Sequence, residues 1–80
     1  MKHLAAALAL CLAASPALAF HCPADMSKID AALDAGPELS DAELARVRQL
    51  RAEGARLHAA GQHQQSVDTL AEAMRILGIQ

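Results

Sequence analysis

The stretch that decides the fold runs from residue 40 to residue 61 and reads SDAELARVRQLRAEGARLHAAG. It opens with a capping box, in which the side chains of Ser40 and Glu43 are expected to satisfy each other's free backbone N–H groups. Apolar residues then recur at helical spacing, and Gly61 is a stop signal. The sequence therefore predicts one helix of roughly 20 residues that begins at this capping box.

A second helix is predicted on the other side of Gly61, over residues 62–77. Its apolar residues also fall at helical spacing, and Gly78 follows them as a C-terminal stop. Because only a few residues around Gly61 connect the two helices, they are expected to lie antiparallel and adjacent. Residues 40–78 are thus predicted to form an αα-hairpin.

A shorter helix is predicted before the hairpin, over residues 22–35. Pro23 suits its first position, because the fixed φ fits a helix and the missing N–H would be unpaired there. The pair Gly36-Pro37 ends it. One apolar stripe runs along this helix: Met26, Ile29 and Leu33. Since no alternating run of β-branched residues indicates a strand, the expected fold class is all-α, with three helices.

Residues 1–19 have the pattern of a signal peptide. A basic start is followed by a Leu/Ala-rich run, and Ala17-Leu18-Ala19 places small residues where a signal peptidase needs them. The run is shorter than the ~20 residues of a bilayer span, which disfavours a retained anchor. We expect cleavage before Phe20, a small helical domain over residues 20–80, no stable membrane span after processing, and a periplasmic or secreted location.

The charge and the aromatic content of the predicted mature chain exclude several function classes. Lys2 leaves with the leader, whereas all nine acidic residues remain, so the mature chain is acidic. This argues against nucleic acid as a partner. Phe20 is the single aromatic residue, so stacking platforms for bases, sugars or cofactor rings are missing and we expect no cofactor. No Ser/His/Asp ordering or phosphate-binding glycine loop indicates catalytic residues, and we expect no enzyme activity.

Several positions of the hairpin match a known repeat. Leu50 matches the large apolar residue of the repeat, and Gly54 and Ala73 match the small residues at which its helices pack. Gly61 matches the turn glycine, and His63 stands at the aromatic position that follows the turn. In this register the hairpin resembles a tetratricopeptide repeat running from residue 47 to residue 80. Every aromatic of the repeat is replaced, and a generic three-helix bundle is the alternative. The resemblance implies a protein-binding role without chemistry of its own.

The start of the predicted mature chain carries candidate metal ligands. An α-amine, the His21 imidazole and the Cys22 thiol lie within three residues and can in principle bind copper or zinc. Cys-Pro is also a context for haem ligation. The alternatives are a frayed terminus in which Cys22 caps a helix, and a disulfide to a partner. His58 and His63 flank the turn, and we interpret them as turn-packing residues because no Cys or carboxylate is evidently aligned with them.

The last helix carries the candidate partner-binding residues. The apolar content of the chain exceeds what a three-helix core is expected to hide, which predicts an exposed stripe. The stripe is formed by Val67, Leu70, Met74 and Leu77, and Ile76 lies off it. The residues that we expect to bind a partner are Val67, Leu70, Met74 and Ile76. The expected function is therefore a non-enzymatic interaction module of the cell envelope that binds another envelope protein or forms a homo-oligomer. The alternative is a small periplasmic metal-binding or haem-binding protein that uses His21 and Cys22.

Overall fold

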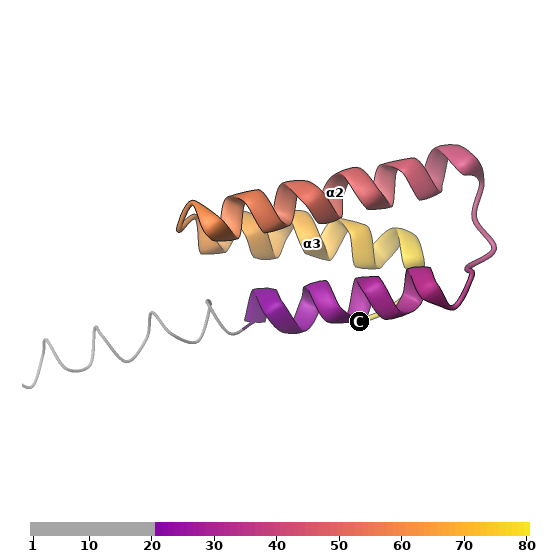
Figure 1. The fold of residues 1–80 in the computed structure, drawn as a ribbon, viewed down its shortest axis with the longest axis horizontal. Helices are drawn as coiled ribbons and strands as arrows, with labels where there is room; N and C mark the ends of the chain where they lie inside the picture. The colour runs from indigo at the N-terminus through magenta and orange to yellow at the C-terminus, as the bar shows by residue number, and fades with distance from the viewer. Residues whose placement is uncertain (1–20) are drawn as a thin grey trace, which may run out of the picture.

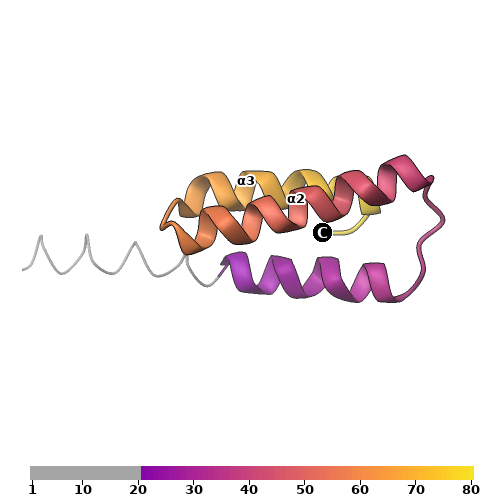
Figure 2. The same cartoon turned by 45° about the horizontal axis from the view of Figure 1, so that its top comes forward.

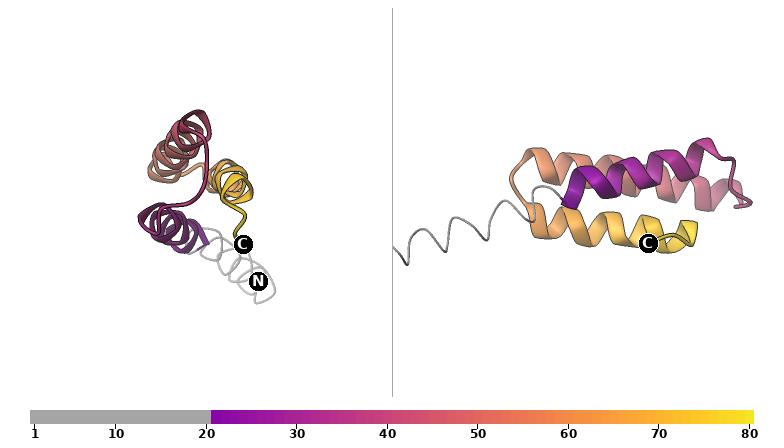
Figure 3. Two further views of the ribbon diagram at one scale, coloured as in Figure 1. Left: turned by 90° about the vertical axis from the view of Figure 1, so that its right-hand side faces the viewer. Right: turned by 90° about the horizontal axis from the view of Figure 1, so that it is seen from below.

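The computed structural model describes residues 21–80 and shows a bundle of three helices (Figure 1). The N-terminal helix occupies residues 21–34, α2 spans Asp41–Ala59 and α3 spans His63–Leu77. Seen end-on in Figure 3, the three helices stand at the corners of a triangle. No strand occurs between residues 21 and 80, and the predicted all-α class is confirmed. The predicted signal peptide lies outside the described residues.

The helix α2 begins at the predicted capping box. The Ser40 hydroxyl accepts a hydrogen bond from the Glu43 N–H at 3.1 Å, and Oε1 of Glu43 accepts one from the Ser40 N–H at 3.0 Å. Each side chain thus satisfies a backbone donor that has no partner inside the helix. The hydrogen bonds from Ser40 also lower the pKa of the Glu43 carboxyl group. The prediction of this helix start is confirmed.

The helices α2 and α3 are in close contact at Gly54, which is buried between them. The Ser66 hydroxyl donates a hydrogen bond of 2.7 Å to the carbonyl oxygen of Gly54. Leu70, which is fully buried, packs over the same glycine, and a Cβ atom added to Gly54 would lie 2.6 Å from Cγ of Leu70. The missing side chain of Gly54 therefore sets how close the two helices can come.

The N-terminal helix packs along the hairpin, parallel to α3 and antiparallel to α2 (Figure 2). Cys22 and Ile29 are fully buried in the shared core. Asp30 and Arg51 form a bidentate ion pair between this helix and α2, with N···O distances of 2.9 and 3.0 Å. These contacts attach the N-terminal helix along its length. No helix of the described residues is long and apolar enough to cross a membrane.

The core takes its side chains from all three helices. Its buried apolar members are Cys22, Ile29, Val47, Leu50, Leu57, Leu70, Ala73 and Met74. Two of the four residues predicted to bind a partner are therefore core residues, and the other two, Val67 and Ile76, are partly buried against this core. The N-terminal helix covers more of the hairpin than its short apolar stripe suggested. A partner could contact the fully buried Leu70 only after the bundle had opened, whereas Met74 keeps an exposed fraction of 8%.

Replacing Gly54 with leucine is expected to reduce the free energy of unfolding by about 1–3 kcal/mol, because the new side chain would push Leu70 and α3 away. Ala45→Leu places the same side chain at an exposed position of α2 and is the control, for which we expect little change. Urea denaturation of the two variants measures the difference. Equal midpoints would contradict the close contact at Gly54.

Acid should weaken the attachment of the N-terminal helix. The hydrogen bonds from Arg51 hold the pKa of the Asp30 carboxyl group below its usual value, so folding favours the ionised form. This contribution is complete above the unfolded-state pKa, near pH 4, and is lost as the pH falls through the lower folded-state pKa. We expect Asp30→Asn to reduce the loss of stability below about pH 4. Urea midpoints across this pH range, with the exposed Asp34→Asn as control, test this prediction.

Candidate metal centre

Three side chains that commonly bind metals meet at one end of the bundle. Cys22 comes from the first turn of the N-terminal helix, His58 from the last turn of α2 and His63 from the first position of α3. One ligand atom from each residue can be chosen such that all three atoms lie within 4.8 Å of one another. The group thus joins all three helices, although 41 residues separate Cys22 from His63.

The turn between α2 and α3 brings the two histidines together. Gly61 adopts a φ of 79°, in the left-handed region that favours glycine. Its N–H donates to the carbonyl oxygen of His58 at 3.0 Å, and the Gln62 N–H donates to that of Leu57 at 2.9 Å. These hydrogen bonds reverse the chain within a few residues. As a result, His58 and His63 face each other across the turn.

The two imidazoles have a geometry that suits a shared ion. Their Nδ1 atoms lie 3.3 Å apart, and the ring centroids are 5.0 Å apart with the planes inclined by 63°. Two nitrogens bound to one zinc at ~2.0–2.1 Å and at the tetrahedral angle are about 3.3–3.4 Å apart. The observed spacing of the Nδ1 atoms, at which the two imidazoles share a hydrogen bond, therefore also matches that of a chelated pair.

Cys22 closes the third side of this group. Its side chain is fully buried, and its thiol donates a hydrogen bond to the carbonyl oxygen of His63 at a distance of 3.7 Å. Both histidines are partly exposed. An ion could therefore reach the group from the side of the imidazoles, while the sulfur would hold it from the interior of the bundle. Cys22 is a free cysteine in this structure.

The structure places His21 differently from Cys22. The His21 side chain is about half exposed, and its Nε2 lies 3.4 Å from Oδ2 of Asp25, one turn further along the helix. The predicted pair of ligands thus separates, since Cys22 points into the bundle and His21 points along its surface. The sequence showed His58 and His63 on either side of a turn glycine. It gave no signal that a cysteine from another helix lies against them.

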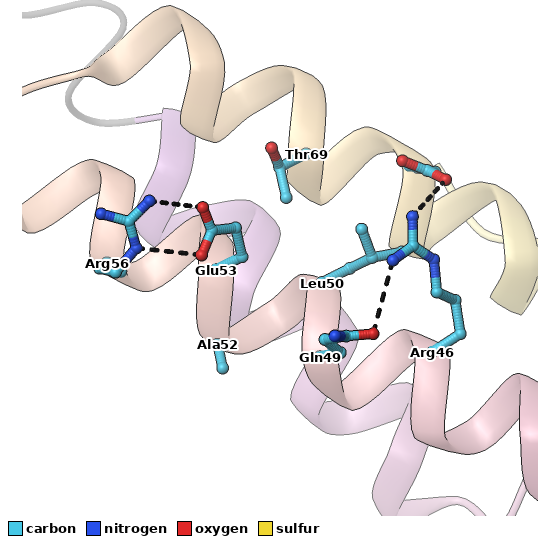
Figure 4. Close-up of a pocket in the computed structure, with 8 residues that line it drawn as sticks. Arg46, Gln49, Leu50, Ala52, Glu53, Arg56 and Thr69 are labelled. Atoms are coloured by element: carbon cyan, nitrogen blue, oxygen red, sulfur yellow. Dashed lines mark hydrogen bonds and ion pairs between the residues drawn. The ribbon is translucent and has the colours of Figure 1, made fainter.

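A shallow groove on the hairpin is a second candidate site (Figure 4). It lies over α2 and α3, and its lining comprises Arg46, Gln49, Leu50, Ala52, Glu53, Arg56, Thr69 and Glu72. Arg46 pairs with Glu72 at 3.2 Å, and Arg56 pairs with Glu53, whose pKa is lowered by the hydrogen bonds from Arg56. Every charged side chain of the groove is thus paired within it. The groove presents no unbalanced charge to a ligand, and the metal-ligand group remains the stronger candidate.

A comparison with known protein families matches residues 20–80 to the PA14_33160 family. No curated protein and no solved structure matches the chain. The family match covers most of the sequence and includes every residue of the three helices described above. The chain therefore belongs to the PA14_33160 family.

Proposed function

We propose that this protein binds a transition-metal ion through Cys22, His58 and His63. The observation that carries the proposal is the convergence of these three ligand atoms within 4.8 Å, from three different helices. A thiolate and two imidazoles form a donor set that suits copper and zinc. The turn holds the two histidines close together, and packing in the core holds Cys22 beside them. Binding would therefore require little rearrangement of the backbone.

The proposed ion would also link the N-terminal helix to the hairpin. It would connect Cys22 near the start of that helix to the turn between α2 and α3, far along the chain. A ligand that binds only the folded protein stabilises it, and a metal that joins distant segments couples binding to folding. The role that this supports is a small metal-binding accessory protein.

Zinc is preferred to haem within this proposal. A haem ligated by Cys22 would need space for its macrocycle beside the sulfur. Cys22 is instead enclosed in the core with Ile29 and Leu70, and no part of its surface is exposed. Haem binding at Cys22 would therefore require the N-terminal helix to leave the hairpin. A single ion fits the observed packing without that change.

The proposed location is the cell envelope, by export to the periplasm or secretion. The matched family segment begins at residue 20, which is also the first residue that the sequence predicts for the mature chain. Copper and zinc ligation by a single buried thiol would then operate in an oxidising compartment, where an unprotected thiol is easily lost to oxidation. Complete burial of Cys22 is consistent with such a setting.

A protein-interaction role, with a tetratricopeptide-like hairpin, is the second candidate function. It is favoured by a shallow surface depression at the C-terminal end of α3, whose lining includes the apolar residues Ala71, Met74 and Ile79. Ile76 and Leu77 nearby are also only partly buried. This surface is suited to a second copy of the chain or to another envelope protein. It is smaller than the stripe predicted from the sequence, because the N-terminal helix covers part of α3.

Cys22→Ser is expected to weaken binding of Zn²⁺ and Co²⁺ by about 100-fold or more, because it removes the thiolate ligand. His63→Ala should have a similar effect. His21→Ala should retain binding, since His21 lies outside the group. Metal titrations of protein expressed from the full 80-residue sequence, with circular dichroism to verify helical content, provide the measurement. Equal binding by wild type and Cys22→Ser, or no binding by either, would disprove the proposed site.

The proposed export is tested by the mass of the product. Expression of the full sequence in a bacterium should give an envelope protein that starts at Phe20, because Ala17-Leu18-Ala19 directs cleavage there. Native mass spectrometry of this fraction would report the N-terminus, any bound ion and any dimer together. An uncleaved chain that remains with the membranes would contradict both the predicted processing and the proposed location.

A further inference from the structure

Asp25 lies near the start of the N-terminal helix and is unusual because its charged side chain is buried. Only 3% of it is exposed. Its Oδ2 lies 3.4 Å from the partly exposed His21, whereas its Oδ1 is buried without a hydrogen-bond partner. Among the described residues this is the single buried side-chain oxygen or nitrogen that lacks one. Since burial of an unpaired carboxylate is unfavourable, this position requires an explanation.

The position of Asp25 relative to Cys22 suggests that explanation. The two residues are three positions apart on one helix, so they lie one above the other on the same face, and both are buried against the hairpin. Ligands at this spacing bind a common metal centre in helical bundles. Asp25 is not one of the three residues whose ligand atoms lie within 4.8 Å of one another, but it lies one turn along the same helix face from Cys22 and has an unused oxygen.

We propose that Asp25 is the fourth ligand of this metal centre, through Oδ1, and that the ion is Zn²⁺. The inference rests on the proposed metal-binding function. It adds a donor to a set of three, which gives the four ligands that a structural zinc site requires. The Asp25 side chain would have to turn away from His21. The His21 end of that contact is about half exposed, so the contact itself opposes the movement only weakly.

The summed charge of the four proposed ligands favours a divalent ion. A Cys22 thiolate and an Asp25 carboxylate together bring two negative charges into a buried site, and the two imidazoles are neutral when they bind a metal. Zn²⁺ balances these charges, whereas Cu⁺ would leave one negative charge unbalanced in the core. The mixture of sulfur, nitrogen and oxygen donors is also typical of zinc.

The position of Asp25 near the start of the N-terminal helix does not account for its burial. A carboxylate in the first turn does interact favourably with the helix dipole. An exposed carboxylate provides the same interaction without the loss of hydration. Glu43, in the first turn of α2, is in that situation: it is exposed and hydrogen-bonded to its cap. The burial of Asp25 therefore indicates a further role.

The test compares Asp25→Asn with wild type, and uses the exposed Asp34→Asn on the same helix as the matched control. Each protein, expressed from the full sequence, is titrated with Zn²⁺, Co²⁺ and Cu⁺. Asp25→Asn should bind Zn²⁺ at least about 10- to 100-fold more weakly, with a much smaller loss for Cu⁺. The Co²⁺ complex of the wild type should show the visible bands of four-coordinate cobalt together with a thiolate charge-transfer band. Asp25→Asn should alter the visible bands of four-coordinate cobalt and retain the thiolate charge-transfer band.

The metal-free proteins give a second readout with the opposite sign. Without an ion, Asp25→Asn should melt at a higher temperature than the wild type, because it replaces a buried carboxyl group whose Oδ1 lacks a hydrogen-bond partner with a neutral amide. A variant that binds Zn²⁺ as tightly as the wild type, loses Zn²⁺ and Cu⁺ equally, or melts lower would overturn the role of Asp25. The three-residue site would then stand without it. A wild type that binds none of the three ions would instead refute the proposed function itself.

Discussion

The contact between α2 and α3 at Gly54 determines the arrangement of the other parts. The two backbones can approach because this residue has no side chain, and the Ser66 hydroxyl then reaches the Gly54 carbonyl oxygen at 2.7 Å. That hydrogen bond satisfies two buried polar groups and fixes how far α3 is displaced along α2. This register is compatible with the short turn between Ala59 and His63, which brings His58 and His63 together. A different register would separate the two imidazoles.

The same contact also shapes the surface on which the N-terminal helix lies. With α2 and α3 close together, one shared groove accepts the side chains of Cys22 and Ile29. The attachment combines apolar contacts, through Ile29 and Leu33, with the ion pair between Asp30 and Arg51. At its start the helix contributes Cys22 and Asp25, two groups whose polar atoms are poorly satisfied by the surrounding protein.

Local signals in the sequence predicted the fold well. The capping box at Ser40, the glycine stops and the helical spacing of apolar residues each depend on neighbours within one or two turns. The metal-ligand group depends instead on how the N-terminal helix is rotated against the hairpin, which no local pattern records. His58 and His63 were visible as a pair at a turn, but the approach of Cys22 was not. The burial of Leu70 and Met74, two of the four residues predicted to bind a partner, has a related cause, since it depends on the long-range packing of the three helices.

The order in which the helices fold determines how long the Cys22 thiol is exposed before it is buried. The hairpin is local in sequence and can form early, whereas the N-terminal helix contributes long-range contacts that require the hairpin as their template. Its thiol is synthesised before His58 and His63, and it remains open to disulfide exchange until the helix has docked. After docking, oxidants would reach the sulfur only through local opening of the bundle. The lifetime of the reduced thiol is thus governed by the rate of helix docking and undocking, and not by its intrinsic reactivity alone.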